Sequence, residues 1–357
     1  PTPPRERRVL WSQYHSLRYP PGYVPRDDLD VKADILDWHG DHPHTNFHAA
    51  YDALRSAGYF VEILGSPLTC FDASNYGALL LVDAEEEYSE AEIAKLESDV
   101  KKKGLGVAVF AEWYNVAQME SMRFFDDNTH SYWTPVTGGA NVPALNDLLR
   151  PFGFAFGDRV LSGTAMPRRG KPVVIKSGAN IARAPAGAFL HKARLQDKSK
   201  DLSKRERRAE HAFAAFYQTD GGGVLGGRLA LFGDSNCLDS SHTPGECFDF
   251  LVSTLKYLTE HDRGAGVTDD EKHVAEAYDC GDPEPTRRRD TDMADAMEHI
   301  NRLQREVKLL QKTAPASSPS VAVTPSVTRA TPGAPRRPRS PNEEGRRRRA
   351  SVRLNRT

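Results

Sequence analysis

The chain has 357 residues, enough for one large or two modest domains, and its 39% hydrophobic content is sufficient to bury a core. Its mean hydropathy of −0.58 is low, and its charge is divided unevenly. Residues 313–357 contain ten arginines and two glutamates, a charge of +8, so the formal total of −1 leaves −1 − 8 = −9 on residues 1–312. We therefore expect an acidic folded body and a basic tail.

Several classes of protein are disfavoured by simple sequence features. No apolar run reaches the roughly 18 residues that a membrane span requires, and the opening PTPPRERR has neither a methionine nor an apolar secretory segment. We expect a piece of a longer protein. The four cysteines include no Cys-x-x-Cys pair, which argues against structural zinc. We expect no cofactor, no metal and no nucleic-acid partner.

Short apolar runs alternate with helical patterns over residues 8–260, which is typical of a mostly parallel sheet with helices on both faces. The sequence predicts an α/β domain of flavodoxin-like or glutamine-amidotransferase-like type. Helical spacing and caps predict helices from Asn46 to Gly58, from Ser89 to Gly104, from residue 142 and over about 244–259. Apolar runs predict strands at 8–13, 59–64, 78–83, 106–113, 172–177, 211–218 and 227–234.

The character of the sequence changes beyond residue 260. Residues 261–312 are predicted to form a linker and one short amphipathic helix, whose apolar positions over 293–310 follow a heptad spacing suited to weak self-association. Residues 313–357 are rich in Pro, Ser, Thr, Ala and Arg and are predicted to be disordered. The run RRRRAS within them is interpreted as a solvated tract.

Two segments imitate serine-hydrolase motifs. GDSNCLDSSH places Ser235 after an apolar strand, with Asp239 and His242 following as in an Asp-x-x-His pair. A histidine so close in the chain is poorly placed to act as its base, so the alternative is a turn built from Asp234, Ser235 and Asn236. The other segment, SGTAMP, resembles the serine motif of subtilisin-type proteases but carries Ala165 where the nucleophile would stand.

A third cluster, DWHGDHPHTNFH, gathers ligand-type side chains. Imidazoles and a carboxylate at this density suit a transition metal, but their spacing matches no defined metal motif. The alternative is a loop of polar caps in front of the helix that begins at Asn46. The cluster contains His39, Asp41, His42, His44 and His48.

Several ordered blocks resemble a known family. They read LWSQYHSLRYPPGYVPRDDL, LDWHGDHPHTNF, LRSAGYFVEILGSPLTCFDASNYGALLLVDAEEEY, TGGANVPALNDLL and GDSNCLDSSH, and they span roughly residues 8–258. These blocks are similar to the segment that follows the catalytic domain in the membrane-bound transcription factor site-1 proteases, which are subtilisin-type serine endopeptidases. The tail beyond about residue 260 does not resemble the family.

The resemblance implies an ancillary domain of a protease that works in the endoplasmic reticulum and Golgi lumen. Such a protease cleaves membrane-bound transcription-factor precursors after basic and hydrophobic sequences. The implied partners are a subtilisin-type catalytic domain, in cis if the chain is a fragment, and those precursors. The triad of the family lies in the catalytic domain, so the resemblance assigns no catalytic residue to this sequence.

The resemblance to a flavodoxin-like or amidotransferase-like sheet also predicts where a ligand would bind. In open sheets of this kind ligands lie beyond the carboxyl ends of the strands. No Gly-x-Cys-x-Gly elbow occurs, which argues against amidotransferase activity. The residues expected to line such a cleft are His15, Asp41, His42, His44, Asp83, Trp113, Asp234, Ser235 and Asn236.

The implied oxidising lumen predicts a disulfide between Cys237 and Cys247, which flank the turn after the last strand. Two functions then stay open. One is a non-catalytic accessory domain of a subtilisin-type protease. The other is an independent small-molecule hydrolase or ligand-binding domain that uses a cleft around Ser235 and His42.

Overall fold

The computed structural model describes residues 2–16, 41–127, 130–135, 137–167, 171–199, 209–220, 226–240, 247–260, 274 and 276–287. They belong to one compact unit, Pro1–Arg289. A second unit, Asp290–Thr357, lies outside the described residues. The predicted amphipathic stripe at 293–310 and the predicted disordered tail at 313–357 both fall within this second unit, so they stay predictions.

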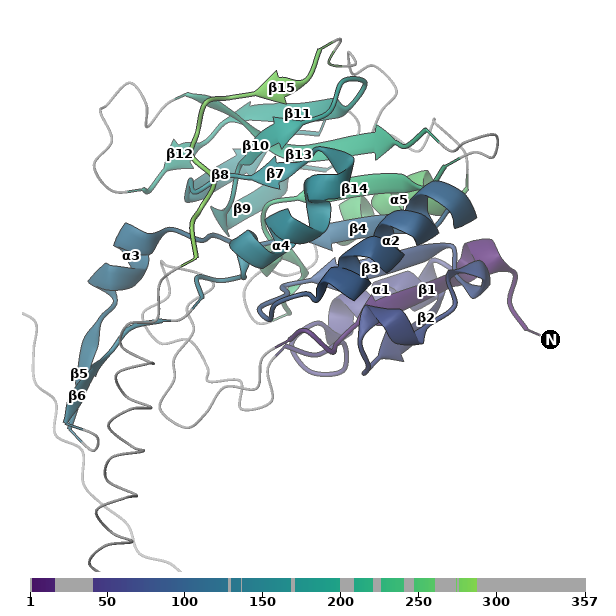
Figure 1. Ribbon diagram of the computed structural model, residues 1–357, viewed down its shortest axis with the longest axis horizontal. Helices are drawn as coiled ribbons and strands as arrows, with labels where there is room; N and C mark the ends of the chain where they lie inside the picture. Colours follow the sequence, from purple (N-terminus) through teal and green to yellow (C-terminus); the bar gives the residue numbers. More distant parts are fainter. Residues whose placement is uncertain are drawn as a thin grey trace, which may run out of the picture. The chain divides into compact units, whose positions relative to one another are not determined.

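A seven-stranded sheet forms the centre of the first unit, in the order β11-β13-β14-β4-β3-β1-β2 (Figure 1). The five strands from β14 to β2 run parallel, and β13 and β11 continue the sheet in antiparallel fashion. The predicted mostly parallel α/β sheet is therefore confirmed. The strands are β1 (Arg8–Ser12), β2 (Phe60–Leu64), β3 (Ala78–Val82), β4 (Gly106–Phe110), β11 (Phe189–Arg194), β13 (Glu210–Gln218) and β14 (Arg228–Phe232).

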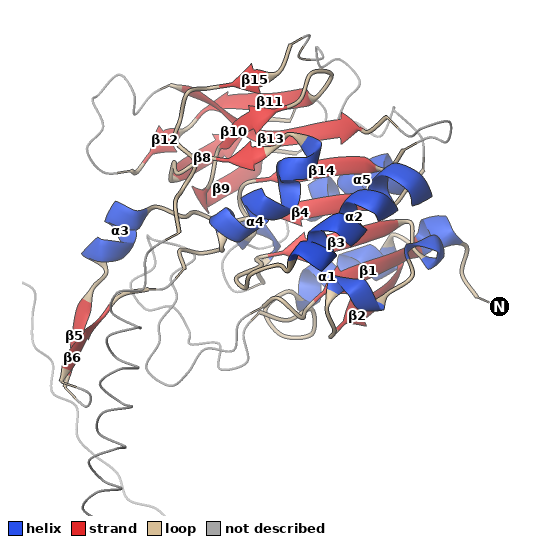
Figure 2. Ribbon diagram, viewed as in Figure 1, coloured by secondary structure: helices blue, strands red, loops and turns tan. Residues whose placement is uncertain are grey.

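Helices cover both faces of this sheet (Figure 2). One face packs against α2 (Glu90–Lys103) and α4 (Val142–Leu149), the other against α1 (His48–Ser56) and α5 (Phe248–Thr259). Alternate residues of β3 divide between the two apolar cores, with Leu79 and Leu81 in one and Leu80 in the other. This double cover explains why β3, β4 and β14 are buried along their whole length and read as unbroken apolar runs.

The helix caps follow the sequence in one case and depart from it in another. Helix α2 begins with the predicted cap, where Ser89 and Glu92 form a reciprocal capping box, and it ends at Gly104, whose φ of 68° is left-handed. The prediction that Asn46 caps the helix that follows it, α1, was wrong. Helix α1 begins after Phe47 without a side-chain cap, because the Asn46 amide is used within the preceding loop.

Short antiparallel elements surround the central sheet, and most of them were not predicted. Two three-stranded sheets have the orders β15-β10-β7 and β12-β8-β9, and β5 pairs only with β6. The strands are β5 (Phe124–Asp126), β6 (Ser131–Trp133), β7 (Ala155–Phe156), β8 (Leu161–Ala165), β9 (Val173–Gly178), β10 (Ile181–Ala184), β12 (Gln196–Asp197) and β15 (Tyr278–Asp279). The remaining helices are α3 (Val116–Ser121) and the 3₁₀ turns Arg5–Arg7, Leu68–Cys70, Ala73–Asn75, Arg150–Phe152 and Asn236–Leu238.

The compact unit extends past the predicted boundary at residue 260. Strand β15 pairs antiparallel with β10, and the residues that follow it make ion pairs with the body of the domain. We call residues 276–287 the strap. A two-residue strand held by charged side chains has no apolar run, so no pattern in the sequence indicates it. Among the described residues, no helix combines the length and apolar character needed to cross a membrane.

Candidate functional site

The predicted edge residues do gather at the carboxyl ends of the parallel strands. In the order of the sheet, Asp234 to Asn236 follow β14, Trp113 follows β4, Asp83 follows β3 and His15 follows β1. None of these side chains is more than 2% exposed, however. These residues therefore lie at the predicted edge of the sheet, but their side chains are buried. Together with their neighbours they form what we call the sealed polar layer.

A residue that the sequence analysis did not single out organises this layer. Glu112 lies two residues beyond the end of β4 and is fully buried. Its Oε1 accepts hydrogen bonds from Ser235 N at 2.5 Å, Ser235 Oγ at 3.0 Å and Asn236 N at 2.8 Å. One carboxylate oxygen therefore holds the whole turn that follows β14. The available signal was an acidic residue at the end of an otherwise apolar strand, since such a charge needs buried donors.

Asp234 adds a second buried carboxyl to the same layer. Its Oδ2 accepts a hydrogen bond from Lys176 N on β9. Burial raises the pKa of Asp234 to about 6, although hydrogen bonds from Lys176 N and from the Glu112 carboxyl act in the opposite direction. Because the Asp234 and Glu112 carboxyl groups are buried in the same layer and influence each other, they titrate as a pair.

These contacts define what Ser235 does. A serine nucleophile needs a base that accepts its proton and space for a substrate carbonyl. The Ser235 hydroxyl is 2% exposed and donates to Glu112, and no histidine of the described part of the chain bonds to it. Asp239 accepts from Asn46 Nδ2 at 3.2 Å, and His242 lies outside the described residues. The geometry assigns Ser235 to the turn.

His15 serves a comparable internal role at the end of β1. Its Nε2 lies 3.1 Å from Glu92 Oε1, and its ring stacks on Tyr88 with centroids 4.2 Å apart. Burial lowers the pKa of His15, which favours the neutral imidazole. Glu92 itself belongs to the capping box of α2 and also accepts from Leu68 N. His15 therefore connects β1 to the start of α2.

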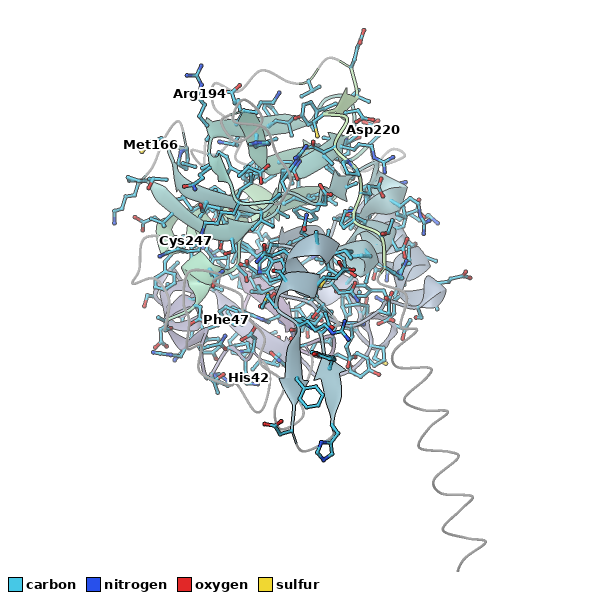
Figure 3. The ribbon with its side chains drawn as sticks, turned by 90° about the vertical axis from the view of Figure 1, so that its left-hand side faces the viewer. His42, Phe47, Met166, Arg194, Asp220 and Cys247 are labelled. Carbon is cyan, nitrogen blue, oxygen red and sulfur yellow. A yellow bond between two sulfur atoms is a disulfide. The ribbon has the colours of Figure 1, made fainter. Side chains whose placement is uncertain are left out.

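The histidine-rich loop is organised around Asn46. The Asn46 side chain accepts from His42 N at 2.9 Å and donates to the carboxylates of Asp41 and Asp239. The loop thus reaches the segment after β14, where Ser240 N also donates to Asn46 O at 2.8 Å. Figure 3 labels His42 and Phe47 of this loop. His44 is exposed. Within the described ranges, no three His, Cys, Asp or Glu side chains are grouped as metal ligands, and His39 lies outside those ranges.

Two cysteines close the turn after β14. The structure joins Cys237 to Cys247 by a disulfide, and both residues are fully buried. The bond connects the 3₁₀ turn after Ser235 to the start of α5. Cys70 and Cys280 are free and exposed. The Ser235 turn is thus held from one side by Glu112 and from the other by a covalent link.

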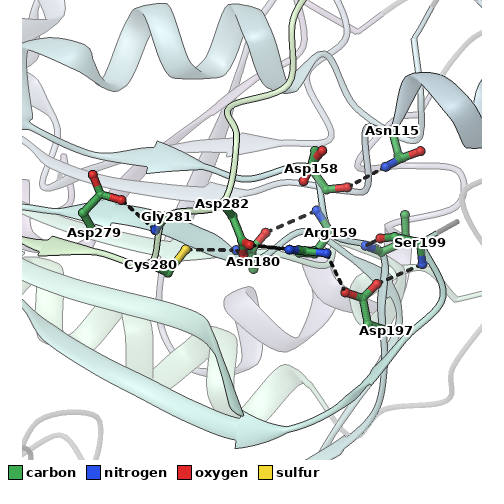
Figure 4. A network of polar contacts seen from close by, with 11 residues as sticks. Asn115, Asp158, Arg159, Asn180, Asp197, Ser199, Asp279, Cys280, Gly281 and Asp282 are labelled. Atoms are coloured by element: carbon green, nitrogen blue, oxygen red, sulfur yellow. Dashed lines mark hydrogen bonds and ion pairs between the residues drawn. The ribbon is translucent and has the colours of Figure 1, made fainter. Parts of the chain in front are cut away.

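A second polar network lies around Arg159 and was also missed (Figure 4). The Arg159 guanidinium donates to Asp282 of the strap at 2.5 and 3.0 Å and lies 3.6 Å from the fully buried Asp197. Asn180 Nδ2 donates to the other oxygen of Asp282 at 2.9 Å. Burial raises the pKa of Asp282, but the hydrogen bonds and the positive charge of Arg159 hold that pKa below its ordinary value. The network fastens the strap to the domain.

Comparison with known proteins decides the family. The family model described as "MBTPS1, fourth GATase-like domain" matches residues 3–273. The chain belongs to this family. The match covers the whole central sheet and its helices, together with the layer around Glu112. The GATase-like domain carries no Gly-x-Cys-x-Gly elbow in its sequence.

Curated relatives of this GATase-like domain are proteases. Subtilisin-like protease SBT6.1 of Arabidopsis thaliana is 55% identical over 267 residues, which are 73% of this chain and 25% of that protein. Membrane-bound transcription factor site-1 protease of Homo sapiens is 49% identical over 261 residues, 72% of this chain and 24% of that protein. The chain therefore spans about a quarter of the length of these relatives and corresponds to an ancillary domain of them.

Among solved structures, the N-terminal domain of mmIFT52 is similar at 13% identity, with 70% of this chain and 97% of that chain covered. Its TM-score of 0.44 is too low to support an argument. The fold assignment therefore rests on the family match and on the sheet topology.

Proposed function

We propose that this chain acts as a non-catalytic ancillary domain of a membrane-bound transcription factor site-1 protease. In this role it supports, in cis, a subtilisin-type catalytic domain that cleaves membrane-bound transcription-factor precursors. The proposal is supported by the family match and by relatives that carry the site-1 protease name. The catalytic steps belong to the other domain, and this domain contributes stability and binding surfaces.

The non-catalytic assignment is supported chiefly by the hydrogen bonds that Glu112 Oε1 accepts from the turn after β14. This oxygen accepts from the amide and the hydroxyl of Ser235 and from the amide of Asn236. An oxyanion hole needs backbone donors that point at a substrate oxygen, and here the donors of the turn point at a buried glutamate. The groups that a hydrolase would present to its substrate are thus committed to the fold.

The disulfide favours a location in the lumen of the endoplasmic reticulum or Golgi. Disulfides persist in oxidising compartments and are rare in the cytosol. The bond between Cys237 and Cys247 links two fully buried cysteines that belong to the apolar core beneath α1 and α5. A domain that depends on this link is suited to the lumenal side of a secretory membrane, which is where a membrane-bound protease presents its ectodomain.

A chimera tests the proposed role. The matched region of Arabidopsis SBT6.1 is replaced by residues 1–289 of this chain, and cleavage of a membrane-tethered reporter with an Arg-x-x-Leu sequence is measured in cells. We expect the chimera to cleave the reporter and a deletion of the region to abolish cleavage. The matched control is the chimera whose host nucleophilic serine is changed to alanine. An inactive chimera that is folded and correctly localised would contradict the proposal.

A further inference from the structure

Within the part of the chain that the structure describes, strands β5 and β6 form a two-stranded ribbon that joins no larger sheet. In Figures 1 and 3 the ribbon extends away from the central sheet. It leaves the domain after α3 and returns before α4. Isolated two-stranded ribbons are only marginally stable in water, so a ribbon of this kind gains stability when a partner covers it.

The base of the ribbon is firmly built into the sealed polar layer. Asn115 caps α3 and donates from Nδ2 to Asp158 O at 3.0 Å (Figure 4). On the returning limb, Gly139 N donates to Trp113 O at 2.9 Å. A Cβ on Gly138 would lie 2.2 Å from Trp113 O. The two limbs therefore close on each other beside Glu112, and the ribbon projects from a rigid footing.

The exposed side chains of the ribbon are of the kind found at the centre of protein interfaces. Phe125 and Tyr132 are paired across the two strands, with ring centroids 5.1 Å apart in an edge-to-face arrangement. They are 46% and 57% exposed. The Arg123 guanidinium lies 4.1 Å from the centroid of the Tyr132 ring. Aromatic residues and arginine dominate the buried anchors of interfaces, whereas a monomer gains nothing from exposing them.

We propose that the β5–β6 ribbon is a docking element, and that an apolar groove on the subtilisin-type catalytic domain of the same protease binds the strip formed by Arg123, Phe125 and Tyr132. This inference rests on the proposed function. The relatives are about four times as long as the matched region, so most of their polypeptide is available in cis. A partner held in cis has a high effective concentration, and a small aromatic strip is then sufficient for stable docking.

Photo-crosslinking in the SBT6.1 chimera tests the docking. p-Benzoylphenylalanine is placed at position 125 in one chimera and at position 60 in another. Phe60 is the matched control because it is also a phenylalanine on a strand and is 50% exposed, but lies on β2 at the edge of the central sheet. We expect cross-links from position 125 to peptides of the catalytic domain and none from position 60.

A binding measurement supplies the second readout. Residues 1–289 are added as a separate protein to SBT6.1 from which the matched region has been deleted, and the Kd of the complex is measured. The double variant Phe125→Ser/Tyr132→Ser of residues 1–289 is compared with the single variant Phe60→Ser. We expect the double variant to raise Kd roughly tenfold or more, as for loss of an interface anchor. Phe60→Ser should leave Kd unchanged. Circular dichroism melts of the isolated variants should match the parent chain.

The outcomes separate the two proposals. An active chimera without cross-links from position 125 to the catalytic domain overturns the docking inference and leaves the ancillary role intact. Cross-links from position 125 to a second copy of the chain also overturn it, in favour of self-association. An inactive, folded chimera contradicts the ancillary role, and the docking inference fails with it.

Discussion

Glu112 and Ser235 are 123 positions apart in the chain and are joined by two hydrogen bonds to one carboxylate oxygen. Glu112 lies two residues beyond the end of β4, and Ser235 lies beyond the end of β14, the adjacent strand in the sheet. This contact converts a turn that resembles a hydrolase motif into a structural junction. Ser235 is held where the sheet, the disulfide and α5 meet.

The first prediction ranks substitutions at this junction. Glu112→Ala leaves three buried donors without an acceptor, so we expect it to lower the free energy of unfolding by about 3 kcal/mol or more. Ser235→Ala removes one hydroxyl and should cost about 1 kcal/mol. Urea denaturation of the two variants measures the difference. A Ser235→Ala variant less stable than Glu112→Ala would contradict the assignment of Glu112 as the centre of the junction.

The second prediction concerns pH. Burial raises the pKa of Asp234 to about 6 from 3.8. Between these values the folded state keeps a proton that the unfolded chain has lost, so this group makes stability fall as pH rises from about 4 to 6, with little change above. Asp234→Asn removes that titration while keeping an acceptor for Lys176 N.

The difference between the two proteins isolates the Asp234–Glu112 pair from the other carboxyl groups. The free energy of unfolding of the parent chain minus that of Asp234→Asn should decrease from pH 4 to pH 6 and then level off. Guanidinium denaturation at several pH values supplies the curve. A difference that is constant across the range, or that increases with pH, would show that Asp234 does not titrate in this way.

The third prediction is that the bond between Cys237 and Cys247 forms in protein secreted from a eukaryotic host. It closes a separation of ten residues, for which chain-entropy estimates give about 2 to 3 kcal/mol. Changing both cysteines to serine should lower the free energy of unfolding by this amount, whereas Cys70→Ser, at an exposed free cysteine, should have no effect. Both cysteines found alkylated in non-reduced tryptic peptides would exclude the bond.

The fourth prediction concerns the strap. The family match ends at residue 273, but Asp282 accepts two hydrogen bonds from Arg159 and one from Asn180. A protein that ends at residue 273 leaves both Arg159 and Asn180 without Asp282 as their acceptor and should melt at a lower temperature than one that ends at 289. Asp282→Asn in the longer protein should reproduce part of the loss. Equal melting temperatures for the two lengths would show that the strap is dispensable.

The parts of the fold that the sequence predicted share a simple physical origin. Strands β3, β4 and β14 are covered on both faces and therefore appear as continuous apolar runs. Helix α2 is marked at both ends by Ser89 and Gly104. The two-residue strands β7, β12 and β15 are too short to produce such a run, and the segment around β15 is held by polar contacts with Arg159 and Asn180, which are more than a hundred residues away.

Which residues meet at the carboxyl edge of the sheet could be predicted from the sequence, and that they line a ligand-binding cleft stays a prediction. Parallel strands end at one edge, so Asp83, Trp113 and Ser235 could be placed together from the order of the apolar runs. Their burial could not be predicted, because it depends on how loops from different strands close over that edge. The same limit applies to Glu112, whose partners lie in a turn more than a hundred residues away.

The central claim is that the carboxyl edge of the sheet maintains the fold and performs no chemistry. The most direct measurement is the rate of reporter cleavage by the SBT6.1 chimera with Ser235→Ala, together with turnover of peptide and ester substrates by the isolated chain. We predict that Ser235→Ala retains the rate of the parent chimera and that the isolated chain shows no turnover. Turnover by the isolated chain that Ser235→Ala abolishes would contradict the account.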